Sequence, residues 1–551
     1  MLVNIRDASR GFFQLIDSVW ATGHTADTIH RICTMMRLMG AKTRVLEELD
    51  TDDREWPRIN KEIEAVRKRT NQKITAKVTK VSFIFTAVPE DKPEELGRLS
   101  PDEILGYAII ITLELTNQIK CCYVFESVVR ELGTPFGKPP TWQPIDNYYL
   151  HARQTLPVRI NKEHEYRIPA TYFCQQNGIT NVCAHACAIM ILNTMRRIEK
   201  DSDILTCEDV NAVLGIDHVA RMQRIPDSWG NNDMCTHDGL SWTELTKLFR
   251  HYGLAVREGD FSGEQRKNFR AFLYGFIESG FPALLCFNVP DLETHSIIQH
   301  VVAVVGHTLS PHSWFPTAFA NYVGKGSDDR GWLSSLDWVN DFLVHDDNFG
   351  MQLCLPAHSF KSEEHPDAGL SFVPIAGLAV FPPALKTTML SFQAEKMAFS
   401  RLIDLLITLR DPSILGLMPY YVQHLVNNIA HGGTPVMRTL MVTKGQYLAH
   451  IAKPDHHGTS LSKDQLYAIS GLLSKYEHFW LVEASEPDLF VGNSTKIIDV
   501  LLDPISDETQ EEGTSGVILI RMPGQLFAPA DAEQYELVCT LNTESHHPLY
   551  Q

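Results

Sequence analysis

The sequence lacks the features that mark nucleic-acid-binding, exported and membrane-spanning proteins. No stripe of lysine and arginine interrupts a formal net charge of −18, which argues against a nucleic-acid partner. The first ten residues carry charge where a signal peptide needs an unbroken apolar stretch. An uncharged stretch at residues 368–385 is broken by prolines and glycines. It therefore predicts two short buried strands and not a membrane span.

Cysteine is scarce and follows no framework spacing. Eleven cysteines in 551 residues, an odd number, predict a reducing cytoplasmic location. The sequence has no Cys-x-x-Cys pair of the kind that structural zinc uses, and no Gly-rich phosphate loop or internal repeat. Cys183, His185 and Cys187 offer metal ligands at close spacing, but helical residues two apart do not share a face. We therefore expect no metal and no organic cofactor.

Length and patterning predict several domains. A chain of 551 residues is too long for one core, and its 44% hydrophobic and 21% charged content is ordinary for a globular protein. Helical periodicity gives way to strand patterns and then, after a polar linker near residue 361, to a mixed pattern. The predicted parts are an N-terminal helical segment (1–72), a β-rich accessory domain (73–165), a central domain (166–360) and a C-terminal mixed α/β domain (361–551).

The strongest functional signal is a cysteine at the start of an apolar helix. A polar, glycine-containing loop leads into Cys183, and apolar residues follow it. A helix N-terminus favours the thiolate, which is the nucleophilic form of cysteine. A cysteine on an apolar helix is otherwise usually a packing residue, and we interpret Cys187 in that way. Upstream, the amide of Gln176 is the kind of donor that stabilises an oxyanion.

Two later segments supply a base and a group to orient it. His300 opens a β-branched run that ends at Gly306, which predicts a buried strand. Asp346 follows another apolar stretch, so we expect it at a strand end, where its carboxylate could bond a histidine on the neighbouring strand. Cys183, His300 and Asp346 would then form a catalytic triad. Asp347 and Asn348, the next two residues, could take this role instead or shape the turn.

Residues 166–360 resemble the papain-like cysteine peptidases, and most closely their C39-like bacterial branch. Members of that branch carry a Gln-to-Cys segment that opens a helix, a His-Val-Val-Val-Val-Gly strand, and a strand that ends in Asp before a glycine turn. Gln176, Cys183, His300 and Asp346 fall on or near those positions. Here the glutamine lies seven positions before the cysteine (183 − 176), and Asn177 occupies the family's position six before it.

The resemblance implies an α+β fold, with a papain-like core flanked by an N-terminal α+β and a C-terminal α/β accessory domain. It implies a cysteine peptidase that hydrolyses a peptide or isopeptide bond of a protein or peptide substrate through an acyl-enzyme. Cys183 would be the nucleophile, His300 the base, Asp346 the orienter and Gln176 the oxyanion donor. Substrate selection, restraint of the peptidase, a partner protein or self-association would fall to the accessory domains.

Two other functions fit the same residues. One is a papain-fold acyl or γ-glutamyl transferase that resembles phytochelatin synthase, which would stall at the acyl-enzyme without an acceptor. The other is a non-catalytic binding protein that retains the fold.

Overall fold

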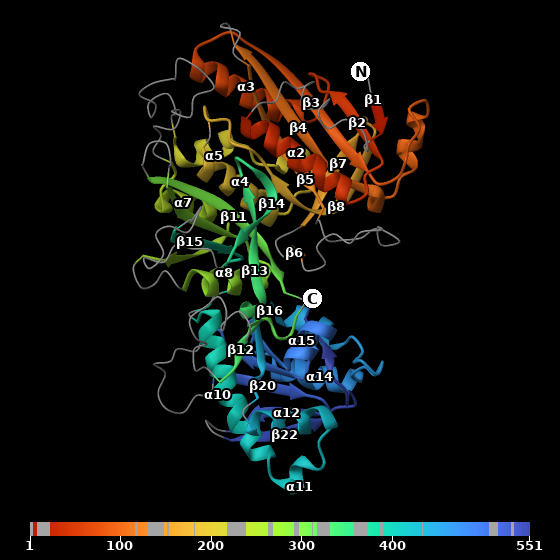
Figure 1. The fold of residues 1–551 in the computed structure, drawn as a ribbon, viewed down its shortest axis with the longest axis vertical. Helices are drawn as coiled ribbons and strands as arrows, with labels where there is room; N and C mark the ends of the chain where they lie inside the picture. The colour runs from red at the N-terminus through yellow and green to blue at the C-terminus, as the bar shows by residue number, and fades with distance from the viewer. Residues whose placement is uncertain are drawn as a thin grey trace. The chain divides into compact units, whose positions relative to one another are not determined.

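The chain folds into two compact units, each with its own sheets (Figure 1). The first unit comprises Met1–Lys267, Gly280–Thr308 and Asp341–Pro382, and the second comprises Asn268–Ser279, Leu309–Asn340 and Pro383–Gln551. The computed structural model describes residues 4–7, 23–115, 120–130, 148–150, 154–180, 182–216, 239–262, 268–290, 297–310, 312–316, 331–357, 373–385, 387, 389–431, 433–505, 516–530 and 534–550.

The first sheet of unit 1 is antiparallel and has the strand order β1-β2-β3-β4-β5-β8-β7. Its strands are β1 (Asn4–Asp7), β2 (Thr43–Glu48), β3 (Ile74–Ile84), β4 (Ile104–Leu115), β5 (Lys120–Val129), β7 (Gln154–Ile160) and β8 (His164–Phe173). Two amphipathic helices, α2 (Gly23–Leu38) and α3 (Trp56–Thr70), bury their apolar residues in the same core. The strand β2 lies inside the segment that was predicted to be helical.

The second sheet of unit 1 has the order β14-β13-β11-β10-β15-β9, and β6 pairs with β11. Its strands are β6 (Tyr148–Leu150), β9 (Ala255–Asp260), β10 (Ala283–Pro290), β11 (Ile297–Leu309), β13 (Val339–Asp346), β14 (Gly350–Pro356) and β15 (Val373–Phe381). The prediction of two short strands within 368–385 is wrong for the described residues, because β15 runs through Pro374. A register shift between Cys286 and Phe287 on β10 accommodates the proline.

One helix is buried nearly all round. The helix α4 (Cys183–Met195) contacts β8 of the first sheet and β10 of the second, and its residues from Ala184 to Thr194 are buried. A helix that is apolar on every side belongs in a core, and this composition places α4 between the two sheets. Two further helices of unit 1, α5 (Cys207–Leu214) and α7 (Trp242–His251), pack against each other.

The second unit is built on a seven-stranded sheet of order β12-β16-β17-β19-β20-β21-β22. Its strands are β12 (Leu333–Ser334), β16 (Val436–Thr443), β17 (His478–Ser485), β19 (Ile498–Leu502), β20 (Val517–Met522), β21 (Gln525–Pro529) and β22 (Tyr535–Thr540), with β18 (Thr495–Lys496) and β23 (His547–Pro548) paired separately. Its helices are α8 (Phe269–Glu278), α10 (Ser391–Leu409), α11 (Pro412–Leu415), α12 (Tyr420–Ala430), α13 (Lys444–Ile451), α14 (Lys463–Leu472) and α15 (Pro487–Asn493). The chain also has short 3-10 helices. Unit 1 contains η1 (Pro93–Arg98), η2 (Pro101–Glu103) and η3 (Asp201–Asp203), and unit 2 contains η5 (Ser335–Trp338).

The mixture of helices with largely antiparallel sheets confirms the predicted α+β class. The limits of the two units differ from the boundaries predicted at residues 72, 165 and 360. The strand β8 pairs with β5 and β7 across residue 165, and β15 joins the sheet that holds His300 across residue 360. The linker predicted near residue 361 lies outside the described residues. Across the described ranges, no helix is long and apolar enough to cross a membrane.

Candidate active site

Cys183 is the first residue of α4, as the sequence predicts. Val182 before it is extended (φ −128°, ψ 175°), and no side chain caps this end of the helix. The first N–H groups of the helix and its dipole therefore favour negative charge at this end. Cys183 is half-buried, whereas the residues that follow it in the helix are buried. Of the two cysteines on this helix, Cys183 is therefore the one with access to solvent, and it lies at the end of the helix that favours negative charge.

The loop before Cys183 is held together by Asn177. The Asn177 Oδ1 atom accepts hydrogen bonds from the backbone N–H groups of Ile179 (2.8 Å) and Thr180 (2.9 Å). Its Nδ2 atom donates to Glu62 Oε1 (2.6 Å) and to Thr180 Oγ1 (2.7 Å). Gly178 has a φ of 69°, a left-handed conformation that glycine adopts without strain. This turn lies between Gln176 and Cys183, where the resemblance to the peptidases predicts one residue more than in that family.

The two glutamines before this loop have different partners. Gln175 is buried and donates to Thr28 Oγ1 (3.3 Å). The Gln176 Nε2 atom donates to Asn348 Oδ1 (2.8 Å), two residues beyond Asp346. Gln176, not Asn177, is therefore the side chain that reaches the turn after β13. The Gln176 amide carries two N–H groups, and the bond to Asn348 uses one of them.

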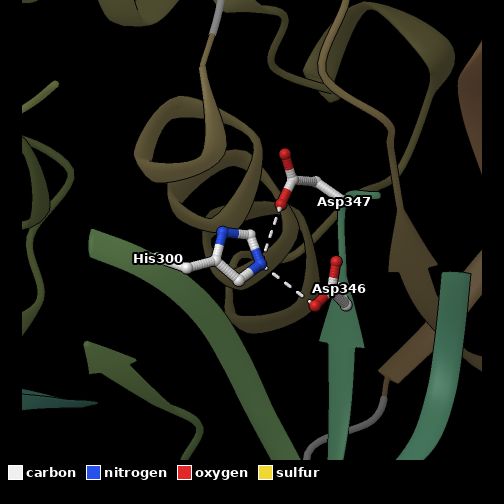
Figure 2. A group of neighbouring side chains, drawn as sticks. All are labelled: His300, Asp346 and Asp347. Atoms are coloured by element: carbon white, nitrogen blue, oxygen red, sulfur yellow. Dashed lines mark hydrogen bonds and ion pairs between the residues drawn. The ribbon is translucent and has the colours of Figure 1, made fainter. Parts of the chain in front are cut away.

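His300 lies on β11 and faces two carboxylates (Figure 2). Its Nε2 atom is 3.0 Å from Asp346 Oδ2 and 3.8 Å from Asp347 Oδ1. On the neighbouring strand β10, Phe287 pairs with His300 and packs edge-on against its ring at 5.6 Å. The ring is thus held from one side by packing and from another by a charge-assisted hydrogen bond.

The Cys183 side chain lies close enough to the His300 ring to raise its pKa. Burial lowers the pKa of His300, but the hydrogen bond with Asp346, the Cys183 side chain and the charges of Asp346 and Asp347 raise it more. The pKa of His300 therefore lies well above its usual value, which favours the imidazolium.

A second cysteine fixes the spacing between α4 and β11. The Cys187 thiol, one turn beyond Cys183, donates to the carbonyl oxygen of Val301 (3.2 Å), which directly follows His300. Cys187 is fully buried, and burial raises the pKa of its thiol well above the usual value. It therefore stays protonated and acts in packing, as predicted.

Asp346 is the last residue of β13 and is held by its own turn. The turn Asp347–Phe349 joins β13 to β14, and Asp346 pairs with Gly350 across the hairpin. The Asp346 Oδ1 atom accepts from the N–H groups of Asn348 (2.8 Å) and Phe349 (3.3 Å), while Oδ2 faces His300. Burial raises the pKa of Asp346, but the His300 bond and charge and these N–H groups lower it more. Asp346 is ionised at neutral pH.

Asp347 is the second carboxylate beside His300. Its side chain is completely buried, and neither of its carboxylate oxygens has a hydrogen-bond partner at a second residue among those described. Burial raises its pKa to about 7, the charge of His300 lowers it and the charge of Asp346 raises it. Near neutral pH, Asp346 is therefore the charged carboxylate and Asp347 is divided between its two protonation states.

Within the described ranges, the side chains of His300, Asp346 and Asp347 form the one group that could hold a metal ion. One ligand atom each from His300, Asp346 and Asp347 lies within 4.8 Å of the others. A cation there would have to break the hydrogen bond between His300 and Asp346 and remove the Asp347 proton. The other candidate, Cys183-His185-Cys187, does not converge: His185 is buried inside α4 and Cys187 bonds Val301.

No protein-family model, curated protein or solved structure matches this chain. The papain-like core inferred from local motifs therefore stays a prediction. What the structure adds is the common location of Cys183, His300 and Asp346, with Gln176 joined to the same turn through Asn348.

Sequence reasoning missed the supporting residues Thr28 and Glu62. Thr28 and Glu62 lie on the N-terminal helices, more than 100 residues from the loops they contact (for example 177 − 62). No local motif marks a threonine or glutamate for such a role. Asn348 was expected to shape the turn or to replace Asp346, but its hydrogen bond from Gln176 was not predicted.

Proposed function

We propose that this chain is a cysteine peptidase that hydrolyses a peptide or isopeptide bond of a protein or peptide substrate. The observation that carries the proposal is the placement of His300, bonded through Nε2 to the ionised Asp346 and close enough to Cys183, at the start of α4, for that side chain to raise its pKa. Each of the three groups has a recognised role in acyl transfer. The free thiols of Cys174, Cys187 and Cys207 agree with the reducing cytoplasm we propose as its location.

The reaction follows from this geometry. The Cys183 sulfur attacks the carbonyl carbon of the scissile bond while the thiol proton resides on His300. The carbonyl oxygen becomes an oxyanion, stabilised by the Gln176 amide and by the backbone N–H of Cys183. The C–N bond then breaks, and the imidazolium protonates the leaving amine.

Deacylation uses the same groups in reverse. Water attacks the thioester carbon and gives its proton to His300, and the C–S bond breaks to release the carboxylic acid. Breaking the C–S bond leaves Cys183 as the thiolate beside the His300 imidazolium, which is the pair from which the cycle began. Asp346 stays ionised throughout and stabilises the imidazolium that forms in each half-reaction. The cycle consumes one water and needs no cofactor.

The test is a covalent probe followed by a turnover assay. A peptide vinyl sulfone should alkylate Cys183, as mapped by mass spectrometry, and Cys183→Ala should remove the labelling. The matched control is Cys187→Ala, which removes a thiol one turn along the same helix and should leave labelling in place. Absence of labelling at Cys183 would contradict the proposal and favour a non-catalytic binding protein.

The same enzyme separates hydrolase from transferase. A thioester or ester acyl donor should form an acyl-enzyme at Cys183, and the intact mass should return to that of the free enzyme in water alone. An acyl-enzyme that persists until a peptide amine is added would instead identify an acyl or γ-glutamyl transferase.

A further inference from the structure

The N-terminal helix α2 holds the turn that carries the predicted orienter. Thr28 on α2 is completely buried, and its Oγ1 atom donates to the carbonyl oxygen of Asn348 (3.1 Å). The same Oγ1 atom accepts the hydrogen bond from Gln175. One hydroxyl thus joins the helix to the Asp346 turn and to the strand end that precedes Gln176. Thr28 and Asn348 are 320 residues apart along the chain.

Asn348 transmits this contact to both functional side chains. Its carbonyl is held by Thr28, its backbone N–H donates to Asp346 Oδ1, and its side-chain oxygen accepts from Gln176. A shift of Asn348 would therefore move the orienter and the proposed oxyanion donor together.

Arg31, one turn further along α2, holds the strand that follows. Its Nε atom donates to the carbonyl of Met351 (3.2 Å) and its Nη2 atom to that of Gln352 (2.6 Å). Gln352 has a φ of 48°, in the left-handed region that non-glycine residues rarely adopt. At Gly350 (φ 118°), an added Cβ would lie 3.1 Å from Arg31 Cγ and 3.7 Å from Thr28 Cα. The helix thus lies closely against the hairpin, and glycine is what permits the approach.

The helix α3 supports the opposite side of the site. Glu62 is buried, and its Oε1 atom accepts from Asn177 Nδ2 (2.6 Å) and Thr180 Oγ1 (2.9 Å) in the loop that leads to Cys183. The helix α3 therefore contacts the loop before Cys183, and the helix α2 contacts the turn after Asp346.

We infer that α2 is part of the catalytic apparatus and that Thr28 and Arg31 are positioning residues, which fix Asp346 and Gln176 through Asn348. This inference rests on the proposed function. It replaces the view of residues 1–165 as an accessory region: the part that includes α2 completes the site. Thr28 and Arg31 touch neither substrate nor the reacting atoms, so they act through the orientation of the His300 partner.

The experiment compares full-length Thr28→Val, Thr28→Ser and wild type. Valine keeps the shape of threonine but loses the hydroxyl, whereas serine retains it. For a peptide substrate, Thr28→Val should lower kcat about tenfold and change KM by less than about twofold, because orientation and not binding is lost. Thr28→Ser should restore kcat. His30→Ala, at an exposed position of the same helix, should match wild type.

A second readout needs no substrate. The rate of Cys183 alkylation by iodoacetamide is followed against pH. A poorly oriented Asp346 stabilises the imidazolium less, so the rise of the rate in Thr28→Val should move to higher pH. If Thr28→Val does not fold, Arg31→Met tests the same claim with the same readouts.

The two failures are distinguishable. If wild-type Cys183 is not alkylated faster than the buried cysteines, the proposed function fails, and the inference fails with it. If wild-type Cys183 reacts and turns over but Thr28→Val has the same kcat and the same pH profile, only the inference is overturned. A change in KM alone would also overturn it.

Discussion

Gln176 donates its side-chain amide to Asn348 at 2.8 Å, and the backbone N–H of that same asparagine holds Asp346. The proposed oxyanion donor and the proposed orienter therefore share one partner. Asn177, which occupies the position that the family's glutamine would take, has both ends of its amide bonded inside its own loop and to Glu62. The structure separates the two candidates by their surroundings, which the spacing alone could not do.

Substitution of Gln176 should affect turnover and not the reactivity of the thiol. Loss of one oxyanion donor typically lowers kcat by roughly a hundredfold, or about 3 kcal/mol of transition-state stabilisation. We expect Gln176→Ala to show this loss while iodoacetamide still labels Cys183. Asn177→Ala should instead lower the melting temperature, because it removes one of the two hydrogen bonds that Glu62 accepts and the side-chain acceptor of two backbone N–H groups. Small and equal effects of both substitutions on kcat would rule out a role for Gln176.

The two aspartates should differ in their effects. Asp346→Asn removes the charge bonded to His300 and favours the wrong tautomer, so kcat should fall by a factor of up to about 10⁴. Added to His300→Ala, the same change should have little further effect, because the residues act as a unit. A damaging Asp347→Asn combined with a silent Asp346→Asn would show that the orienter is Asp347.

Asp347→Asn should change the pH dependence of the reaction. The pKa of Asp347 is raised to about 7 by burial, so the wild-type carboxyl is mostly protonated at pH 6 and the variant should then resemble wild type. Above pH 7 the ionised wild-type carboxylate helps to keep His300 protonated, and the asparagine cannot. The alkaline fall of kcat should therefore begin at lower pH in Asp347→Asn. An unchanged pH–rate profile would contradict this role.

Glu62 should make the folded state less stable as pH rises. Burial raises the pKa of Glu62 to about 7, whereas an unfolded glutamate titrates near about 4.3. Between these values the folded protein retains a proton that the unfolded chain has lost, so the free energy of unfolding falls with pH, by up to roughly 4 kcal/mol.

Thermal denaturation of Glu62→Gln tests this. Glutamine keeps an acceptor for Asn177 and Thr180 but cannot ionise. Its melting temperature relative to wild type should therefore be higher at pH 8 than at pH 5. Glu64→Gln, at an exposed position of α3, should show the same difference at both pH values. A Glu62→Gln difference that does not vary with pH would refute the titration.

The sequence predicted the elements that carry the site better than it predicted their support. The polar loop before Cys183, the β-branched run after His300 and the apolar stretch before Asp346 each produce a local pattern, and the structure has a helix start, a strand and a strand end there. These patterns report short-range periodicity and propensity, which a single sequence contains.

The contacts made by Thr28, Glu62 and Asn348 depend on how distant segments pack. The packing of α2 against β14 brings Thr28 to Asn348 across 320 residues, and a buried threonine looks the same in the sequence as any other core threonine. Asp347 was visible only as a neighbour of Asp346. Its complete burial beside His300 depends on how the three-residue turn packs, which no periodicity reveals.

The most direct test is the pH dependence of Cys183 alkylation by iodoacetamide, in wild type and in His300→Ala, with each labelled cysteine identified by mass spectrometry. A Cys183–His300 pair predicts that Cys183 is alkylated first and already reacts quickly at pH 6, where an ordinary thiol, with a pKa near about 8.5, is almost fully protonated. In His300→Ala that reactivity should move to higher pH, and Cys187 should stay unlabelled in both proteins. A wild-type Cys183 that reacts only above about pH 8, with no change in His300→Ala, would contradict a catalytic pair.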